Sequence, residues 1–115
     1  MRIQLESQGF EVTPAIREHV YDQLAFHLAN FTAHVMAVTV YLSDVNGPRG
    51  GPDKHVVLDV NLGRSGGVPV QQPRDDLYAA VSQAARQAGR TVRRSLGRAR
   101  RMERMATREL RQLTR

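Results

Sequence analysis

The chain has 115 residues, no cysteine and a formal net charge of +6 at pH 7. This length fits a single domain, and the lack of cysteine excludes disulfides and thiolate sites. No apolar run approaches the roughly 18 residues of a membrane span, and the alternating N-terminus does not resemble a signal peptide. We therefore expect no membrane partner and the cytoplasm as the compartment.

The positive charge is concentrated at one end of the chain. Residues 86–115 contain eleven arginines and two glutamates, a net charge of +9, whereas residues 1–85 contain six basic and nine acidic residues, a net charge of −3. So dense a cationic segment repels itself unless an anion neutralises it. The asymmetry predicts a polyanionic partner, and a nucleic acid is the usual one.

The first part of the sequence predicts a strand, a helix and a second strand. Polar and apolar residues alternate over residues 2–8, as in a half-buried strand. Thr13-Pro14 is typical of a helix start, and an apolar stripe at spacings of three and four continues as far as Phe31. Residues 35–43 are β-branched and aromatic, and we expect Met36 on their inward face with Val38, Val40 and Leu42.

A turn-rich loop over residues 44–53 leads to two further strands. Residues 54–62 alternate, with Val56, Leu58, Val60 and Leu62 inward. Residues 68–72 form a short fourth strand, which we place at the edge of the sheet because Pro69 has no N–H for a neighbouring strand.

A long helix follows, capped by Asp75 or Asp76. Its apolar stripe runs from Leu77 to Leu96, and we expect Gly89 to allow close packing on the sheet. Residues 98–115 keep helical spacing, and we expect either a helical extension or a frayed tail, with little contact with the core. We divide the chain into a domain over 1–96 and an arginine-rich C-terminal extension over 97–115.

The order of elements is β-α-β-β-β-α, which predicts an α+β fold. The first two strands, joined by a helix, should pair in parallel, and the last three should form an antiparallel meander. This gives a four-stranded mixed sheet with both helices packed on its one apolar face.

Two segments carry a resemblance to a known family. FEVTPAIREHV follows the first strand and DDLYAAVSQAARQAGRTVRR follows the fourth. In order and spacing, residues 1–96 resemble the ribosome hibernation-promoting factors, which include the ribosome-associated inhibitor A (sigma-54 modulation) proteins. The resemblance implies a fold like that of double-stranded-RNA-binding domains. It also implies binding to the small ribosomal subunit where mRNA and tRNA meet, which blocks translation and stabilises idle ribosomes. We expect a short form that lacks the family's additional C-terminal domain.

The resemblance also suggests residues that contact ribosomal RNA. Arg90, Arg93 and Arg94 match positions that are usually basic on the family's second helix, and Arg86 lies one turn earlier. The same cationic helix continues through Arg98 and Arg101. The first helix is usually basic in the family, but here Gln23, Ala25 and Phe26 occupy that region. Arg17 is therefore the basic residue of the first helix that we include in the predicted RNA-binding set.

Other functions remain open from the sequence. The protein could bind double-stranded RNA in general, or it could self-associate through residues 98–115, where apolar residues keep helical spacing: Met102, Ala106, Leu110 and Leu113. The four histidines have no i,i+4 pair, so we expect no metal site. No arrangement of residues suggests catalysis, and we expect neither an enzyme, a cofactor nor a small-molecule substrate.

Overall fold

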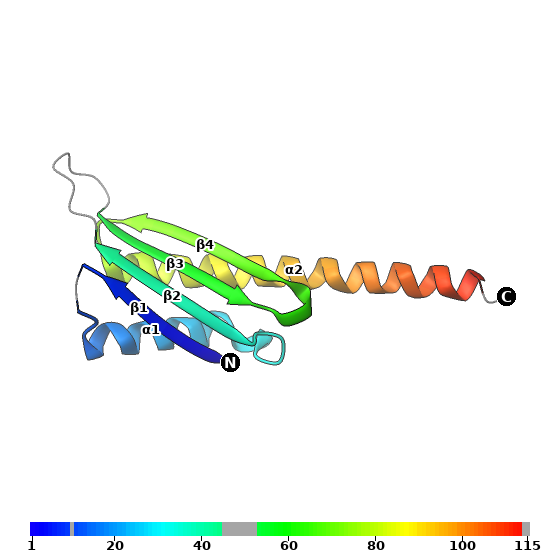
Figure 1. The fold of residues 1–115 in the computed structure, drawn as a ribbon, viewed down its shortest axis with the longest axis horizontal. Coiled ribbons are helices and arrows are strands. Elements are labelled where there is room, and N and C mark those ends of the chain that lie inside the picture. Colours follow the sequence, from blue (N-terminus) through cyan, green and yellow to red (C-terminus); the bar gives the residue numbers. More distant parts are fainter. Residues whose placement is uncertain (10, 45–52, 114–115) are drawn as a thin grey trace.

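The computed structural model describes residues 1–9, 11–44 and 53–113. It contains one sheet with two helices on one side (Figure 1). The elements in chain order are β1 (Arg2–Gln8), α1 (Pro14–His27), the 3-10 turn η1 (Ala29–Phe31), β2 (Ala37–Asp44), β3 (Lys54–Asn61), the 3-10 turn η2 (Gly63–Ser65), β4 (Gly67–Arg74) and α2 (Leu77–Leu113). The predicted α+β fold and its β-α-β-β-β-α order are confirmed. Most of the predicted loop over residues 44–53 lies outside the described residues.

The sheet has the order β1-β2-β3-β4. β1 pairs with β2 in parallel, and the other two pairs are antiparallel. β4 is an edge strand, as predicted from Pro69. A residue without an N–H can lie on the open side of the strand, where no neighbouring strand needs the donor.

The core lies between the sheet and the two helices. Every buried residue in the described part of the chain is either apolar or a glycine. The inward rows of the strands are in register, so that Leu5, Val40, Leu58 and Val70 form one line across the sheet. Burial of each large aliphatic side chain stabilises the fold by roughly 1.5–3 kcal/mol.

Met36 is not part of this core, contrary to the expectation from its spacing. Its side chain is 65% exposed. The residue precedes β2, and its sulfur lies against Gly63 of η2, 3.0 Å from where a Cβ at Gly63 would be. The alternation of the strand therefore continues one residue beyond the part of the sheet that the helices cover.

Both helices begin as their capping residues predict. The Thr13 Oγ1 accepts a hydrogen bond from the Ile16 N–H at 3.2 Å, with Pro14 in the first turn. The Asp76 carboxylate accepts one from the Tyr78 N–H at 3.0 Å, so Asp76 rather than Asp75 caps α2. α1 is shorter than predicted, since it ends at His27 and its apolar stripe continues through η1.

The sequence led us to expect that Gly89 allows close packing on the sheet. In the structure Gly89 instead allows a close approach to α1. A Cβ at this position would lie 2.8 Å from the carbonyl oxygen of His27. The two helices therefore touch backbone to backbone where α2 passes the C-terminal end of α1. A second contact between the helices lies nearer their N-terminal ends. There the His19 Nε2 is 3.1 Å from both the Tyr78 carbonyl oxygen and the Ser82 Oγ.

α2 continues well beyond the sheet (Figure 1). Its last buried residue is Leu96, and every residue from Arg100 to Leu113 is exposed. Gly97 does not interrupt the helix. At a rise of 1.5 Å per residue, the part after Leu96 projects about 25 Å. It contributes to a molecule of 67 × 29 × 18 Å.

Candidate nucleic-acid interface

The arginines of α2 lie on one continuous exposed surface, which we call the arginine stripe. All ten that the structure describes are exposed: Arg86, Arg90, Arg93, Arg94, Arg98, Arg100, Arg101, Arg104, Arg108 and Arg111. Successive members are mostly three or four residues apart, a spacing that places side chains one above another on a helix. The stripe lies opposite the buried row of α2, which includes Ala84, Ala88 and Val92.

The two borders of the stripe face different elements. Arg86 and Arg93 lie on the side of α1, because they line a hollow together with His27 of that helix. Arg94 and Arg98 follow Gln87 by seven and eleven residues and share its side of α2. Gln87 accepts a hydrogen bond from the Gln72 side-chain amide of β4. The stripe is therefore as wide as the exposed part of the helix.

From Arg86 to Arg108, the guanidinium groups of the stripe form no ion pair with a carboxylate among residues 1–9, 11–44 and 53–113. Lys54, outside the stripe, pairs with Asp44 at 2.7 Å and with Asp53 at 3.6 Å. Glu103 follows Leu96 by seven residues, so it lies on the continuation of the buried row and away from the stripe. An anionic partner would thus meet arginines that already have their charge and donors exposed.

Six of the seven sequence-predicted site residues lie in this stripe, and Arg17 does not. Arg17 is on α1, two residues before His19, and residues two apart on a helix project to nearly opposite sides. Since His19 contacts α2, Arg17 points away from α2, where its Nη1 donates to the Tyr21 hydroxyl at 3.4 Å. The structure does not bring Arg17 together with the α2 arginines.

A hollow of about 140 Å³ lies between the end of α1 and the middle of α2, and we call it the α1–α2 hollow. It is lined by His27, Asn30, Phe31, Arg86, Gly89, Arg90 and Arg93. Burial, and secondarily the charge of Arg86, lowers the pKa of His27 below its usual value. The sequence did not suggest His27 or Asn30, because their position depends on where the two helices cross.

Phe26 is a second feature that sequence spacing did not assign to a site. Its side chain is 76% exposed, and its ring meets the His27 ring edge to face, with the centroids 5.0 Å apart. One signal was available in the sequence, since Phe26 is an aromatic residue off the apolar stripe of α1. An exposed aromatic ring in contact with His27, which lines the same hollow as three arginines, is a suitable surface for a nucleic-acid base.

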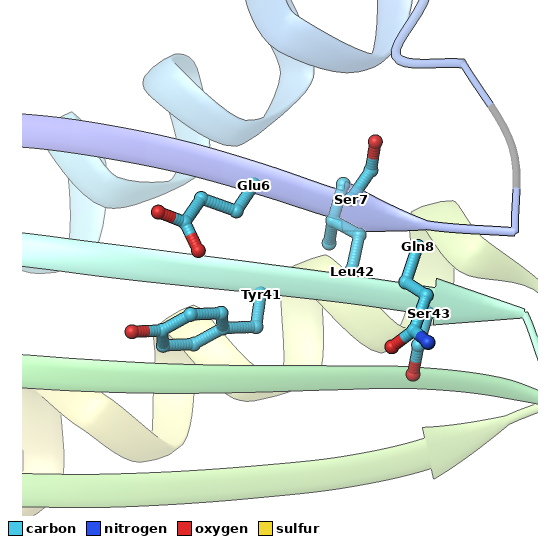
Figure 2. Close-up of a pocket in the computed structure, with 6 residues that line it drawn as sticks. All are labelled: Glu6, Ser7, Gln8, Tyr41, Leu42 and Ser43. Carbon is cyan, nitrogen blue, oxygen red and sulfur yellow. The ribbon is translucent and has the colours of Figure 1, made fainter.

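The opposite face of the sheet differs in charge from the helical side. A hollow of about 410 Å³ lies over the ends of β1 and β2, and among its lining residues only Glu6 is charged: Glu6, Ser7, Gln8, Tyr41, Leu42 and Ser43. Glu6 and Tyr41 are register partners, and their side chains lie next to each other on this face (Figure 2). A carboxylate here disfavours RNA phosphate, so α2 offers the better surface for a polyanion.

The described residues form neither a cluster of metal ligands nor a membrane-spanning helix. Within 1–9, 11–44 and 53–113, no three His, Asp or Glu side chains come together to hold a metal ion. No helix in the same ranges combines the length and apolar character that crossing a bilayer requires.

Comparison with known proteins identifies the family. Residues 3–100 match the family model described as sigma 54 modulation protein / S30EA ribosomal protein. A comparison with curated protein sequences gives no match.

Two solved structures share the fold. A ribosomal subunit interface protein from Coxiella burnetii superposes with a TM-score of 0.72 at 20% identity, covering 84% of this chain and 99% of the other. The N-terminal domain of Thermus thermophilus Protein Y gives a TM-score of 0.67 at 28% identity, covering 82% and 98%. These matches agree with the resemblance seen in the sequence. The chain belongs to the sigma 54 modulation protein / S30EA ribosomal protein family.

Proposed function

We propose that this protein binds the small ribosomal subunit through ribosomal RNA, occupies the channel of mRNA and tRNA, and keeps idle ribosomes inactive. Family membership supports an association with the ribosome, and one structural relative is itself a ribosomal subunit interface protein. A ribosome-bound role agrees with the cytoplasmic compartment expected from the sequence. The proposed role is binding and not catalysis.

The arginine stripe is the observation on which this proposal depends. Guanidinium groups form charge-assisted, often bidentate hydrogen bonds with phosphates. From Arg86 to Arg111 the stripe is about 37 Å long, so it can follow several phosphates of an RNA backbone. Such contacts fix a protein on RNA without reading its sequence. The choice of site would come from the shape of the ribosomal RNA.

We assign the RNA contacts to the predicted residues of the stripe: Arg86, Arg90, Arg93, Arg94, Arg98 and Arg101. Arg17 would need a separate segment of RNA, because it points away from α2. Its contribution to affinity should therefore be independent of theirs and smaller.

The test is co-sedimentation with purified small subunits at low and high salt. Replacing Arg90, Arg93 and Arg94 with glutamate should weaken binding by roughly 100-fold or more, since each charge-assisted hydrogen bond contributes about 1.5–3 kcal/mol. The fold should survive because all three side chains are exposed. For the unchanged protein, about five neutralised phosphates imply a loss on the order of 10²–10³ in affinity between 50 and 200 mM salt.

A matched variant separates this site from net charge. Arg2, Arg64 and Arg74 are also exposed but lie outside α2, and their replacement with glutamate changes the net charge by the same amount. Binding of this variant should fall far less. Equal losses in the two variants would contradict the proposed interface, and no pelleting of the unchanged protein at low salt would contradict the function. Equal affinity for random duplex RNA would instead indicate a general double-stranded-RNA-binding protein.

Self-association is a second candidate, favoured by exposed apolar residues after Leu96. Met102 is 71% exposed and Leu113 is 81% exposed, and with Ala106 and Leu110 they would lie on one side of the helix. Two such helices would also bring two arginine stripes together. Analytical ultracentrifugation distinguishes the cases, because only the full chain, and not one ending at Leu96, would then dimerise.

A further inference from the structure

The α1–α2 hollow brings side chains that the proposed function does not use, such as His27, next to three arginines of the stripe. Its residues come from the end of α1, from η1 and from α2, and no carboxylate is among them. A volume of about 140 Å³ accommodates several water molecules, and hence a group as small as a phosphate. The close contact of Gly89 with the His27 backbone fixes the relative position of the two walls.

The charge of the hollow is strongly positive. Arg86, Arg90 and Arg93 all line it, and no side chain that α1 or η1 contributes to its lining is negative. The free carbonyl groups at the end of α1 oppose an anion, but a helix terminus is equivalent to only about half an elementary charge. Three guanidinium groups therefore outweigh it.

His27 is the titratable group between these elements. Its ring is half-buried, and it faces Arg86, Arg90 and Arg93 of α2, the uncharged Asn30 and Phe31 of η1, and the ring of Phe26 on its own helix. A buried imidazole next to cations favours its neutral form. An anion that enters the hollow would reverse that preference.

We propose that the α1–α2 hollow binds one nucleotide of unpaired RNA, with its phosphate held by Arg86, Arg90 and Arg93, its base stacked on Phe26, and one solvent proton taken up by His27. This inference rests on the proposed function, because it names one RNA contact within the same interface. The base must be unpaired because only such a base can leave its neighbours to stack on an aromatic side chain. Phosphate and base sites are adjacent, since the Phe26 and His27 rings touch.

The pH dependence follows from the two states of His27. In the free protein burial first, and the charge of Arg86 second, lower the pKa of His27 from its usual value, which favours the neutral ring. A bound phosphate offsets the Arg86 charge and places an anion beside the ring, which raises the pKa. Binding then takes up a proton between the lower and the higher pKa. Affinity therefore rises as the pH falls from 8 to 6 and levels off below the free-protein pKa.

The experiment measures affinity for small subunits at constant salt from pH 6 to pH 8. The unchanged protein should gain affinity relative to His27→Asn as the pH falls, by at most about tenfold per pH unit for one proton. Taking the ratio of the two proteins removes the titration of the ribosome itself. His34→Asn is the control, because the His34 side chain is exposed and does not line the hollow, and this variant should keep the full pH dependence.

A second variant tests the base. Phe26→Ala should lose affinity by about tenfold at every pH, a typical value for one stacked base. Phe26→Tyr should retain it, and Phe26→Leu should not. Tyr41→Ala is the matched control, since Tyr41 is an exposed aromatic residue on the opposite face of the sheet, next to Glu6, and the affinity of this variant should be unchanged.

The outcomes distinguish this inference from the function on which it rests. If the unchanged protein does not pellet with small subunits at low salt, the proposed function fails. If it pellets but shows the same pH dependence as His27→Asn, the nucleotide site is wrong and the function stands. A measurement without substitutions guards against misfolding: in an NMR titration, a short single-stranded RNA should raise the His27 pKa. An unchanged pKa at saturating RNA would overturn the proposal.

Discussion

Gly89 shows how one missing side chain sets the geometry of the interface. In most helix interiors, replacing glycine with alanine is favourable by about 1 kcal/mol. Here the new Cβ would lie 2.8 Å from the His27 carbonyl oxygen, a distance that backbone atoms cannot tolerate without moving apart. Gly89→Ala should therefore destabilise the protein by about 1–3 kcal/mol, as in other overpacked cores. Urea-induced unfolding would measure this change.

Gly97 on the same helix provides the matched control. A Cβ there would meet no heavy atom within 4 Å, so only the helical preference of alanine acts. Gly97→Ala should stabilise the protein by up to about 1 kcal/mol. If both substitutions shifted stability in the same direction, the contact between Gly89 and α1 would not determine the packing of the helices.

At the scale of elements, α2 consists of two parts with different supports. Up to Leu96 it buries an apolar row against the sheet and α1. Beyond Leu96 the helix continues because elongation from an existing helix avoids the cost of nucleation. Arginine, methionine, leucine, glutamate and alanine, which make up most of this part, are also good helix formers.

Removing the extension should therefore affect binding and not stability. A chain ending at Gly97 keeps every buried residue, so its unfolding midpoint in urea should not change. It retains Arg86, Arg90, Arg93 and Arg94 but loses the rest of the stripe. Its affinity for small subunits should fall, and its salt dependence should become shallower by about 0.7–0.9 in the log–log slope for each lost phosphate contact.

A full-length variant separates charge from apolar contact in the extension. Replacing Arg100, Arg104 and Arg108 with glutamine keeps Met102 and Leu113 in place. If this variant binds like the shortened chain, the extension acts through its charge. If it binds like the unchanged protein while the shortened chain does not, the apolar side of the extension makes the contact instead.

The elements of the fold were largely predictable because local patterns determined them. Alternation placed Val38, Val56 and Val70 inward, and Thr13 predicted the start of α1. The errors came from tertiary position. Met36 continues the alternation of β2, but no helix covers its side chain. The residues next to it in the sequence do not indicate that its side chain is exposed. Likewise, spacing showed that Gly89 faces the core, without showing which element it meets.

At the scale of the whole molecule, the candidate site was predictable only in part. Arginines spaced three and four apart predict one surface of a helix wherever that helix packs. The α1–α2 hollow could not be predicted, because it exists only where α1 ends beside Arg86 and Arg90. The position of Arg17 also depends on the rotation of α1, which the contact of His19 with Ser82 reveals.

The overall shape gives a final prediction that involves no substitution. A compact domain of this length has a radius of gyration of about 13 Å, whereas the described residues give 17.6 Å because α2 projects from the body. Small-angle X-ray scattering of the free protein should therefore give a value close to 17.6 Å, or slightly larger because of hydration. The chain ending at Gly97 should give a value near the compact one. A compact value for the full chain would mean that the extension folds back onto the body, which would cover part of the arginine stripe and remove the long surface that the proposed RNA contact requires.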